Sequence, residues 1–208
     1  MPATRRFVLS LALALATSWL MLAPGASADG VLRLGNATEP ESLDIHLSSG
    51  VAEANIQRDL FEGLVAEAAD ASLIPGAAES WEISDDGTVY TFHMRENGRW
   101  SNGDPVTAHD FVYAFRRGLD PATAAAYAFI LYPIKNAEAL VAGDITDLDQ
   151  LGIRALDDRT LEITLKAPTA YFLDMLTHHM AFPLHKASVE EWGSAWTRPG
   201  NLVGNGAF

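Results

Sequence analysis

Apolar and polar residues alternate along two pairs of short segments, and a turn sequence joins the members of each pair. The turn is Asp85-Asp86-Gly87 in the first pair and Asp157-Asp158 in the second. A period of two places every second side chain on one face, so both pairs predict antiparallel hairpins with one buried face. The predicted strand segments are residues 77–83, 90–94, 153–155 and 161–165, with a further strand at residues 31–34.

Between the hairpins, apolar residues recur with the spacing of a helix. Thr107 caps one predicted helix, which carries Phe111 and Phe115 one turn apart and ends at Gly118. The other predicted helices lie at about residues 53–64, 121–132, 136–142 and 171–177. Helices interleaved with antiparallel hairpins indicate a mixed α/β class, without the β-α-β repeat of a nucleotide-binding sheet.

The first residues are typical of a secretory signal peptide. Two arginines, Arg5 and Arg6, precede an apolar run over residues 7–23, and Ala26 and Ala28 supply the small residues that a signal peptidase requires. We therefore expect residues 1–28 to be removed by cleavage after Ala28. An uncleaved membrane anchor is disfavoured because the run is short for a span and no basic cluster follows it. The arginine pair suggests twin-arginine export, but the rest of that motif is loose, so we expect general secretion.

Charge and cysteine content narrow the class of protein. The 208 residues include 14 basic and 27 acidic side chains and no cysteine. Removing residues 1–28 removes two of the arginines, which leaves 12 basic against 27 acidic residues and a net charge of −15. An acidic surface argues against a nucleic-acid partner, and a chain without cysteine folds without disulfides. We expect an exported periplasmic protein with no lipid-anchor cysteine.

The sequence contains no recognisable catalytic or metal-binding pattern. His178, His179 and His185 lie close together but lack the helical spacing of a metal site, and we expect them to be partly exposed beside a loop. No G-x-S-x-G elbow or phosphate-binding glycine loop is present, so neither an enzyme nor a cofactor is expected. The large aromatic residues have core spacing, whereas Tyr127 lies in an alanine-rich stretch where its phenol could face a cleft.

Several strings in collinear order resemble the periplasmic oligopeptide-binding proteins of ABC importers, an extracellular solute-binding family for peptides and nickel. They cover nearly the whole mature chain. These strings are residues 41–46 (ESLDIH), 55–64 (NIQRDLFEGL), 75–81 (PGAAESW), 90–95, 100–108 (WSNGDPVTA), 110–113, 157–165, 167–172 and 205–208 (NGAF).

The resemblance implies a two-lobed periplasmic-binding-protein-like fold of the large three-domain type. It places residues 29–61 and 186–208 in the N-terminal lobe and residues 62–185 in an inserted α+β domain. Because Asn205-Gly206-Ala207-Phe208 is a turn running into the start of a strand, we expect the sequence to be the N-terminal part of a longer protein. The second lobe, which in this family captures the amine of the peptide, would then lie outside it.

The resemblance also suggests which residues contact a ligand. The segment Ser49-Gly50-Val51 would offer backbone groups to an extended peptide, and Tyr127 would line the cavity. Backbone pairing recognises a peptide whatever its side chains are. Ser49 replaces an acidic residue common in the family, which affects a side-chain role but not a backbone one. Ile45 replaces a usual proline, a change in loop geometry.

The favoured interpretation is therefore a monomeric periplasmic protein that delivers oligopeptides to an inner-membrane ABC permease. One alternative is the same fold binding another solute, such as a dipeptide, a nickel chelate, haem or an opine. The other is a secreted hydrolase fragment, which the missing nucleophile and metal pattern disfavours.

Overall fold

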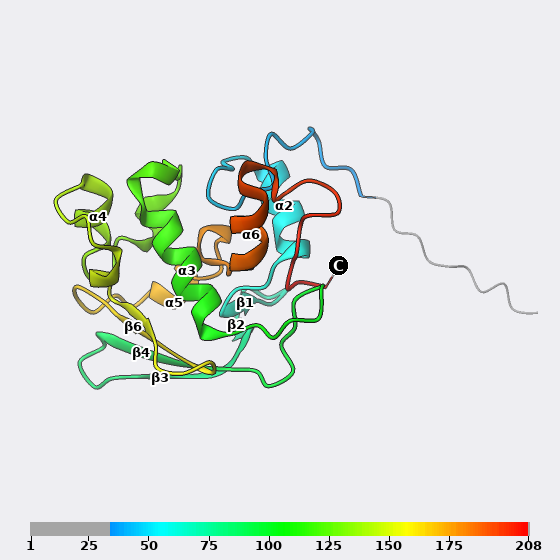
Figure 1. Cartoon of the computed structure of the whole chain (residues 1–208). Coiled ribbons are helices and arrows are strands. Elements are labelled where there is room, and N and C mark those ends of the chain that lie inside the picture. The colour runs from blue at the N-terminus through cyan, green and yellow to red at the C-terminus, as the bar shows by residue number, and fades with distance from the viewer. Residues whose placement is uncertain (1–33, 208) are drawn as a thin grey trace, which may run out of the picture. The chain divides into compact units, whose positions relative to one another are not determined.

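The computed structural model describes residues 34–207 (Figure 1). The predicted signal peptide, its predicted cleavage site at Ala26 and Ala28, and all but the last residue of the strand predicted at residues 31–34 lie outside the described residues. The α-helices are α2 (Val51–Leu60), α3 (Ala108–Leu119), α4 (Ala137–Ala142), α5 (Phe172–Met175) and α6 (Lys186–Trp192). The strands are β1 (Val65–Glu67), β2 (Leu73–Pro75), β3 (Ala78–Ile83), β4 (Val89–Met94), β5 (Ile153–Ala155) and β6 (Thr160–Thr164). Short 3₁₀ helices are η1 (Pro121–Thr123), η2 (Ala128–Leu131), η3 (Leu148–Gln150), η4 (His179–Ala181) and η5 (Gly193–Ala195).

Both predicted hairpins are confirmed, and they join into one antiparallel sheet in the order β3-β4-β6-β5. In this sheet Phe92 of β4 lies opposite Leu161 of β6, and Tyr90 lies opposite Ile163. All four side chains are buried on the face that α3 covers (Figure 1). The alternation therefore fixed both the strands and their buried face. The separate two-stranded sheet of β1 and β2 was not predicted, because each strand has only three residues.

Helix α3 is the central helix of the core, and its predicted start is confirmed. The carboxylate of Asp110, three residues into the helix, accepts the backbone N–H of Thr107 at 2.8 Å and the indole N–H of Trp100 at 3.2 Å. Phe111 and Phe115 are fully buried one turn apart. The helix runs one residue past Gly118, to Leu119.

Two predicted helices differ from the structure. The helix expected at residues 53–64 is α2, which begins at Val51 and ends at Leu60, because Phe61 adopts an extended backbone. The alanine-rich helix expected at residues 121–132 is instead two 3₁₀ helices, η1 and η2. Ala124 has a left-handed backbone (φ 52°), and the N–H of Ala126 donates to the carbonyl of His46 at 3.3 Å rather than within a helix. Tertiary contacts therefore override the high helix propensity of alanine.

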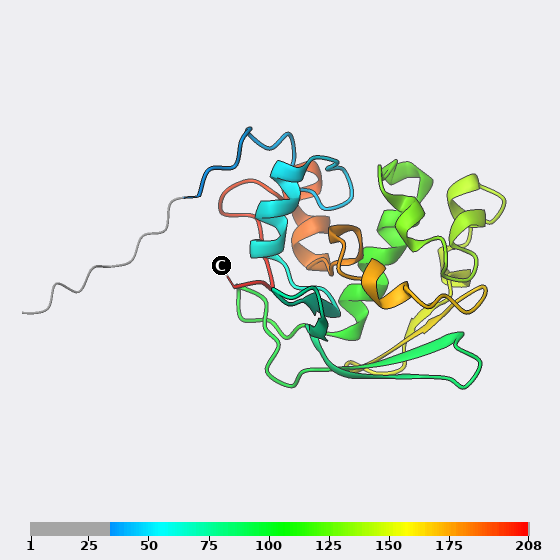
Figure 2. The ribbon, with the colours of Figure 1, turned by 180° about the vertical axis from the view of Figure 1, so that it is seen from behind.

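Over the described residues, a hydrophobic cluster extends from Ile45 to Trp196. It includes Phe92, Trp100, Phe111 and Phe115, and the half-buried Trp81 packs against it, as the core spacing of the aromatic residues predicts. The last described residues pack along the end of α2, where the N–H of Gly206 donates to the carbonyl of Leu60 at 3.0 Å (Figures 1 and 2). The predicted boundaries at residues 61/62 and 185/186 stay predictions.

Candidate functional site

The segment Ser49-Gly50-Val51 forms the beginning of α2. Gly50 is the N-cap with an extended backbone (φ −96°, ψ 159°), and Val51 is the first helical residue, with 78% of its surface exposed. Glu53, in the first turn, folds its carboxylate back over the cap, so that a β-carbon at residue 50 would collide with it. The same carboxylate accepts the backbone N–H of Glu41 at 2.8 Å, and this bond lowers the pKa of Glu53. Glycine and a buried glutamate thus fix the start of the helix.

The backbone of this segment presents donors rather than acceptors. The carbonyl of Gly50 accepts the N–H of Ala54 at 3.2 Å, and the carbonyl of Ser49 accepts the hydroxyl of Tyr127 at 3.3 Å. Within residues 34–207, the N–H groups of Ser49, Gly50 and Val51 have no protein acceptor. Because the first N–H groups of a helix have no partner within it, they are available to a carbonyl or carboxylate from outside.

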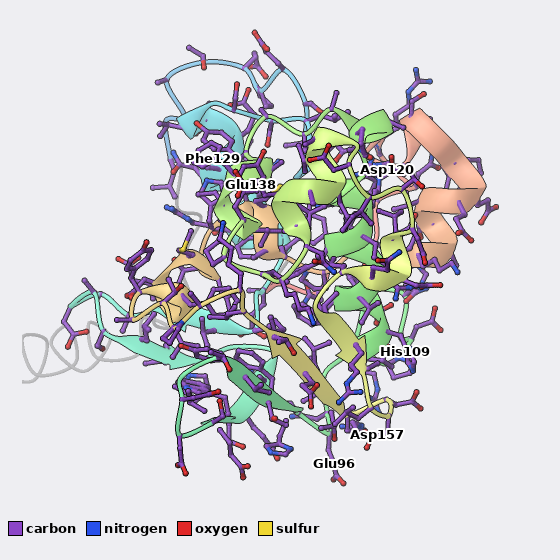
Figure 3. All side chains as sticks on the ribbon, turned by 90° about the vertical axis from the view of Figure 1, so that its left-hand side faces the viewer. Glu96, His109, Asp120, Phe129, Glu138 and Asp157 are labelled. Atoms are coloured by element: carbon purple, nitrogen blue, oxygen red, sulfur yellow. The ribbon has the colours of Figure 1, made fainter. Side chains whose placement is uncertain are left out.

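Tyr127 and Ser49 lie side by side although they are 78 residues apart in the sequence. The half-buried Tyr127 ring packs against two histidines, with ring centres 4.9 Å from His178 and 5.8 Å from His179. Phe129, which Figure 3 labels, has its ring centre 5.6 Å from that of Tyr127. Its surface is 52% exposed. The structure therefore brings together the residues that the resemblance suggested, beside an exposed aromatic side chain.

The histidines of this cluster were not expected to form part of the site. The prediction that His179 is partly exposed is wrong: 5% of its surface is exposed, and burial lowers its pKa to about 4. The Nδ1 atom of His178 accepts the N–H of Met180 at 3.1 Å, so a neutral ring carries its proton on Nε2. Burial, and then the charge of Arg58, lowers the pKa of His178. No sequence signal links these histidines to Tyr127, because the chain between them is about fifty residues long.

His185 and His109 serve local structure. The Nδ1 atom of His185 lies 2.7 Å from the Ser188 hydroxyl at the start of α6, and its Nε2 atom lies 2.9 Å from the carboxylate of Asp104. His109, in the first turn of α3, lies near the β5–β6 turn (Figure 3), where its Nε2 atom is 3.5 Å from the Asp158 carboxylate. Within residues 34–207, no group of three or more potential ligands among histidine, aspartate and glutamate is arranged to hold a metal ion.

A cavity of about 540 Å³ lies at the other end of α2 and does not include the predicted segment. Arg58, Phe61 and Phe182 contribute to its lining, together with Glu62, whose carboxylate is 3.5 Å from Arg95. Burial raises the pKa of Glu62. The candidate binding segment is separate from this cavity, and its residues Ser49 and Val51 are exposed. None of the helices described over residues 34–207 has both the length and the apolar character needed to cross a membrane.

Comparison with known proteins gives consistent matches. The model of the family described as bacterial extracellular solute-binding proteins, family 5 Middle, matches residues 72–208. The periplasmic oligopeptide-binding protein OppA of Salmonella typhimurium is 48% identical over 175 residues, which cover 83% of this chain and 32% of OppA. The probable deoxycholate-binding periplasmic protein YgiS of Escherichia coli is 43% identical over 180 residues, 86% of this chain and 34% of that protein.

The fold comparison agrees with the sequence comparison. The crystal structure of Haemophilus influenzae OppA in complex with the peptide RPPGFSPFR matches with a TM-score of 0.79 and 45% identity, over 83% of this chain and 34% of that one. The expected mixed α/β class and the resemblance to peptide-binding proteins are therefore confirmed. The chain spans about a third of the length of these relatives.

Proposed function

This chain belongs to family 5 of the bacterial extracellular solute-binding proteins, and on that premise we propose that it contributes one wall of an oligopeptide-binding site in a periplasmic component of an ABC importer. The observation that carries the proposal is the row of free N–H groups at Ser49, Gly50 and Val51 beside the Tyr127 ring. Members of this family bind solutes, and we propose no catalytic role.

The free N–H groups suit a ligand whose own backbone offers carbonyl oxygens. An extended peptide presents a carbonyl at every residue, and pairing with it does not depend on the side chains. The exposed side chains of Val51 and Phe129 add apolar surface that excludes water from such pairs. We therefore expect peptides of unrelated sequence to bind through the same three donors.

We propose that the rest of the peptide site lies on the second lobe that the family resemblance implies. We propose the domain arrangement given above, with residues 29–61 and 186–208 in the first lobe and residues 62–185 inserted in it. A charged peptide amine needs a partner when it leaves water, and we place that partner in the second lobe. We further propose cleavage after Ala28, release into the periplasm as a monomer, and delivery of the peptide to an inner-membrane permease.

A second candidate ligand is a carboxylate-bearing amphipathic solute. One relative carries the name of a deoxycholate-binding protein, and free N–H groups beside an apolar surface also fit a carboxylate attached to an apolar body. Peptides remain the favoured class, because the relative of greater identity is named for oligopeptides and a homologous structure holds one.

Calorimetry on the product of the complete gene tests the proposal. Three tripeptides of unrelated sequence, their N-acetylated forms and deoxycholate are titrated separately. We expect all three free peptides to bind, and acetylation to weaken each of them because it removes the charged amine. Binding of deoxycholate alone would favour the second candidate, and binding of neither class would refute the proposal.

A further inference from the structure

Shortly before the candidate binding segment in the sequence, one buried carboxylate joins three distant parts of the chain. The Asp44 carboxylate accepts an N–H from each terminal nitrogen of Arg117, at 3.0 Å and 2.6 Å, in a bidentate ion pair. It also accepts the indole N–H of Trp196 at 3.0 Å. Asp44 and Trp196 are buried, and the Arg117 side chain is 19% exposed. Burial alone would raise the pKa of Asp44, but Arg117 and Trp196 hold it below its usual value.

A buried histidine extends this network towards the binding segment. The Nδ1 atom of His46 lies 2.7 Å from Arg117. Because an arginine only donates, Nδ1 is the acceptor, and a neutral His46 carries its proton on Nε2. Burial, followed by the charge of Arg117, lowers the pKa of His46 to about 3. On its other side the ring faces Gly118, where a β-carbon would lie 2.9 Å from Nε2. The ring is therefore enclosed by α3 and held in one orientation.

The network fixes the path of the backbone up to the binding segment. The carbonyl of Asp44 accepts the N–H groups of Leu47 and Ser48, each at 3.0 Å. The Ser48 hydroxyl accepts the side-chain amide of the buried Gln57 at 2.8 Å, which attaches the turn to α2. Ser49 follows directly and is itself exposed. Fixed residues thus run from Arg117 through Asp44 to the residue before the free N–H groups.

We infer that Arg117 is a positioning residue for ligand binding, which holds the backbone N–H groups of residues 49–51 in the orientation that a ligand pairs with. The inference rests on the proposed function, because it concerns the same segment. Arg117 does not contact the ligand in this account; it acts through Asp44 and His46. A ligand that binds only this conformation has an apparent affinity that falls with the fraction of molecules in it. Loosening the loop therefore raises the measured Kd.

The test compares Arg117→Lys with Arg116→Lys in the product of the complete gene. Lysine keeps the charge but cannot form the bidentate pair. Arg116 is a matched control because it is the neighbouring residue of α3 and pairs with Asp149 at 2.7 Å, away from the loop. Two quantities are measured at a temperature where circular dichroism shows that each variant is folded. They are the Kd for three unrelated tripeptides and the hydrogen exchange of the Leu47 and Ser48 amides without ligand.

For Arg117→Lys we expect a Kd about tenfold higher for every peptide. We also expect the exchange rates of the Leu47 and Ser48 amides to increase more than those of the β4 amides. For Arg116→Lys we expect both quantities within about twofold of the wild type. A peptide Kd unchanged by Arg117→Lys would overturn the inference and leave the proposed function standing. So would a loss of affinity matched by equally faster exchange throughout β4. Where the wild-type protein binds no peptide, the proposed function fails and exchange at Leu47 and Ser48 alone decides whether Arg117 holds the loop.

If Arg117→Lys does not fold, Trp196→Phe provides the same test. It removes one hydrogen bond to Asp44 and keeps an aromatic ring against Phe61, whose ring centre lies 6.2 Å from that of Trp196. We expect faster exchange at Leu47 and Ser48 and a Kd increase of about threefold. A folded Trp196→Phe variant with wild-type exchange and wild-type Kd would contradict the inference.

Discussion

Substituting Val51 by proline deletes one backbone donor of the candidate site and leaves the helix intact. Val51 is the first residue of α2, a position that accepts proline because its N–H takes no part in the helix. The preceding residue must be extended, and Gly50 already is, with ψ at 159°. The exposed side chain loses little packing. We therefore expect the free energy of unfolding to stay within about 1 kcal/mol of the wild type.

The effect on the ligand is expected to be large by comparison. A peptide carbonyl that loses its partner inside a closed site costs about 1–3 kcal/mol, which raises the Kd roughly 5- to 150-fold. Because the lost group is part of the backbone, the factor should be similar for tripeptides of unrelated sequence. Calorimetry on the product of the complete gene measures it, and urea denaturation measures stability.

The matched control is Val51→Ala, which removes most of the side chain and keeps the N–H. We expect its Kd to lie within about threefold of the wild type, since the side chain contributes only apolar contact. If Val51→Pro bound peptides as tightly as Val51→Ala, the backbone donor would have no role. A loss confined to one peptide sequence would likewise refute recognition through the backbone.

Further predictions concern the neighbouring ring, the core and pH. Tyr127→Phe should raise the peptide Kd by less than about fivefold in calorimetry, because its bond to the Ser49 carbonyl is long and exposed; a greater loss would show a direct role for the hydroxyl. In urea denaturation, Phe92→Ala should cost about 3–5 kcal/mol, because the ring is fully buried, whereas Ile83→Ala at a half-exposed position should cost under about 1 kcal/mol; equal costs would contradict the core. The pKa of His179 is lowered from 6.5 to about 4, so between these pH values the unfolded chain binds a proton at this residue and the folded chain does not. Its contribution to stability is therefore lost as pH falls below about 6.5, and from pH 7 to pH 5 the wild type should lose about 2 kcal/mol more than His179→Leu in the same denaturation assay; parallel pH profiles would contradict the buried, neutral ring.

The sequence predicted most of the sheet and α3, because local rules determine both. Alternation of apolar residues around Phe92 and Leu161 defines strands and their buried face at once, and Thr107 with Asp110 defines the start of a helix. These signals need only a few neighbouring residues, so no distant contact overrules them. The stretch after Asp120 behaves differently, because the Ala126 amide pairs with His46 about eighty residues away.

The candidate site could be predicted only in part. The resemblance located Ser49-Gly50-Val51 and Tyr127, and the structure places them beside one another. The bidentate pair of Asp44 with Arg117 spans 73 residues and has no periodic signal. Nor does the sequence show that His179 is buried against Tyr127. Contacts between distant polar residues depend on the finished fold, which is why the pattern of the chain does not reveal them.

The central claim is that residues 49–51 bind the backbone of a peptide, and the Val51 amide tests it most directly. The product of the complete gene is labelled with ¹⁵N-valine. Tripeptides of unrelated sequence are then added to it while the valine amide resonances are followed. Val89, which begins β4 on the sheet, serves as the internal control. We expect every tripeptide to shift the Val51 resonance downfield, as a new hydrogen bond requires, and to leave Val89 unchanged. Saturation with peptide that leaves the Val51 resonance in place would contradict the claim.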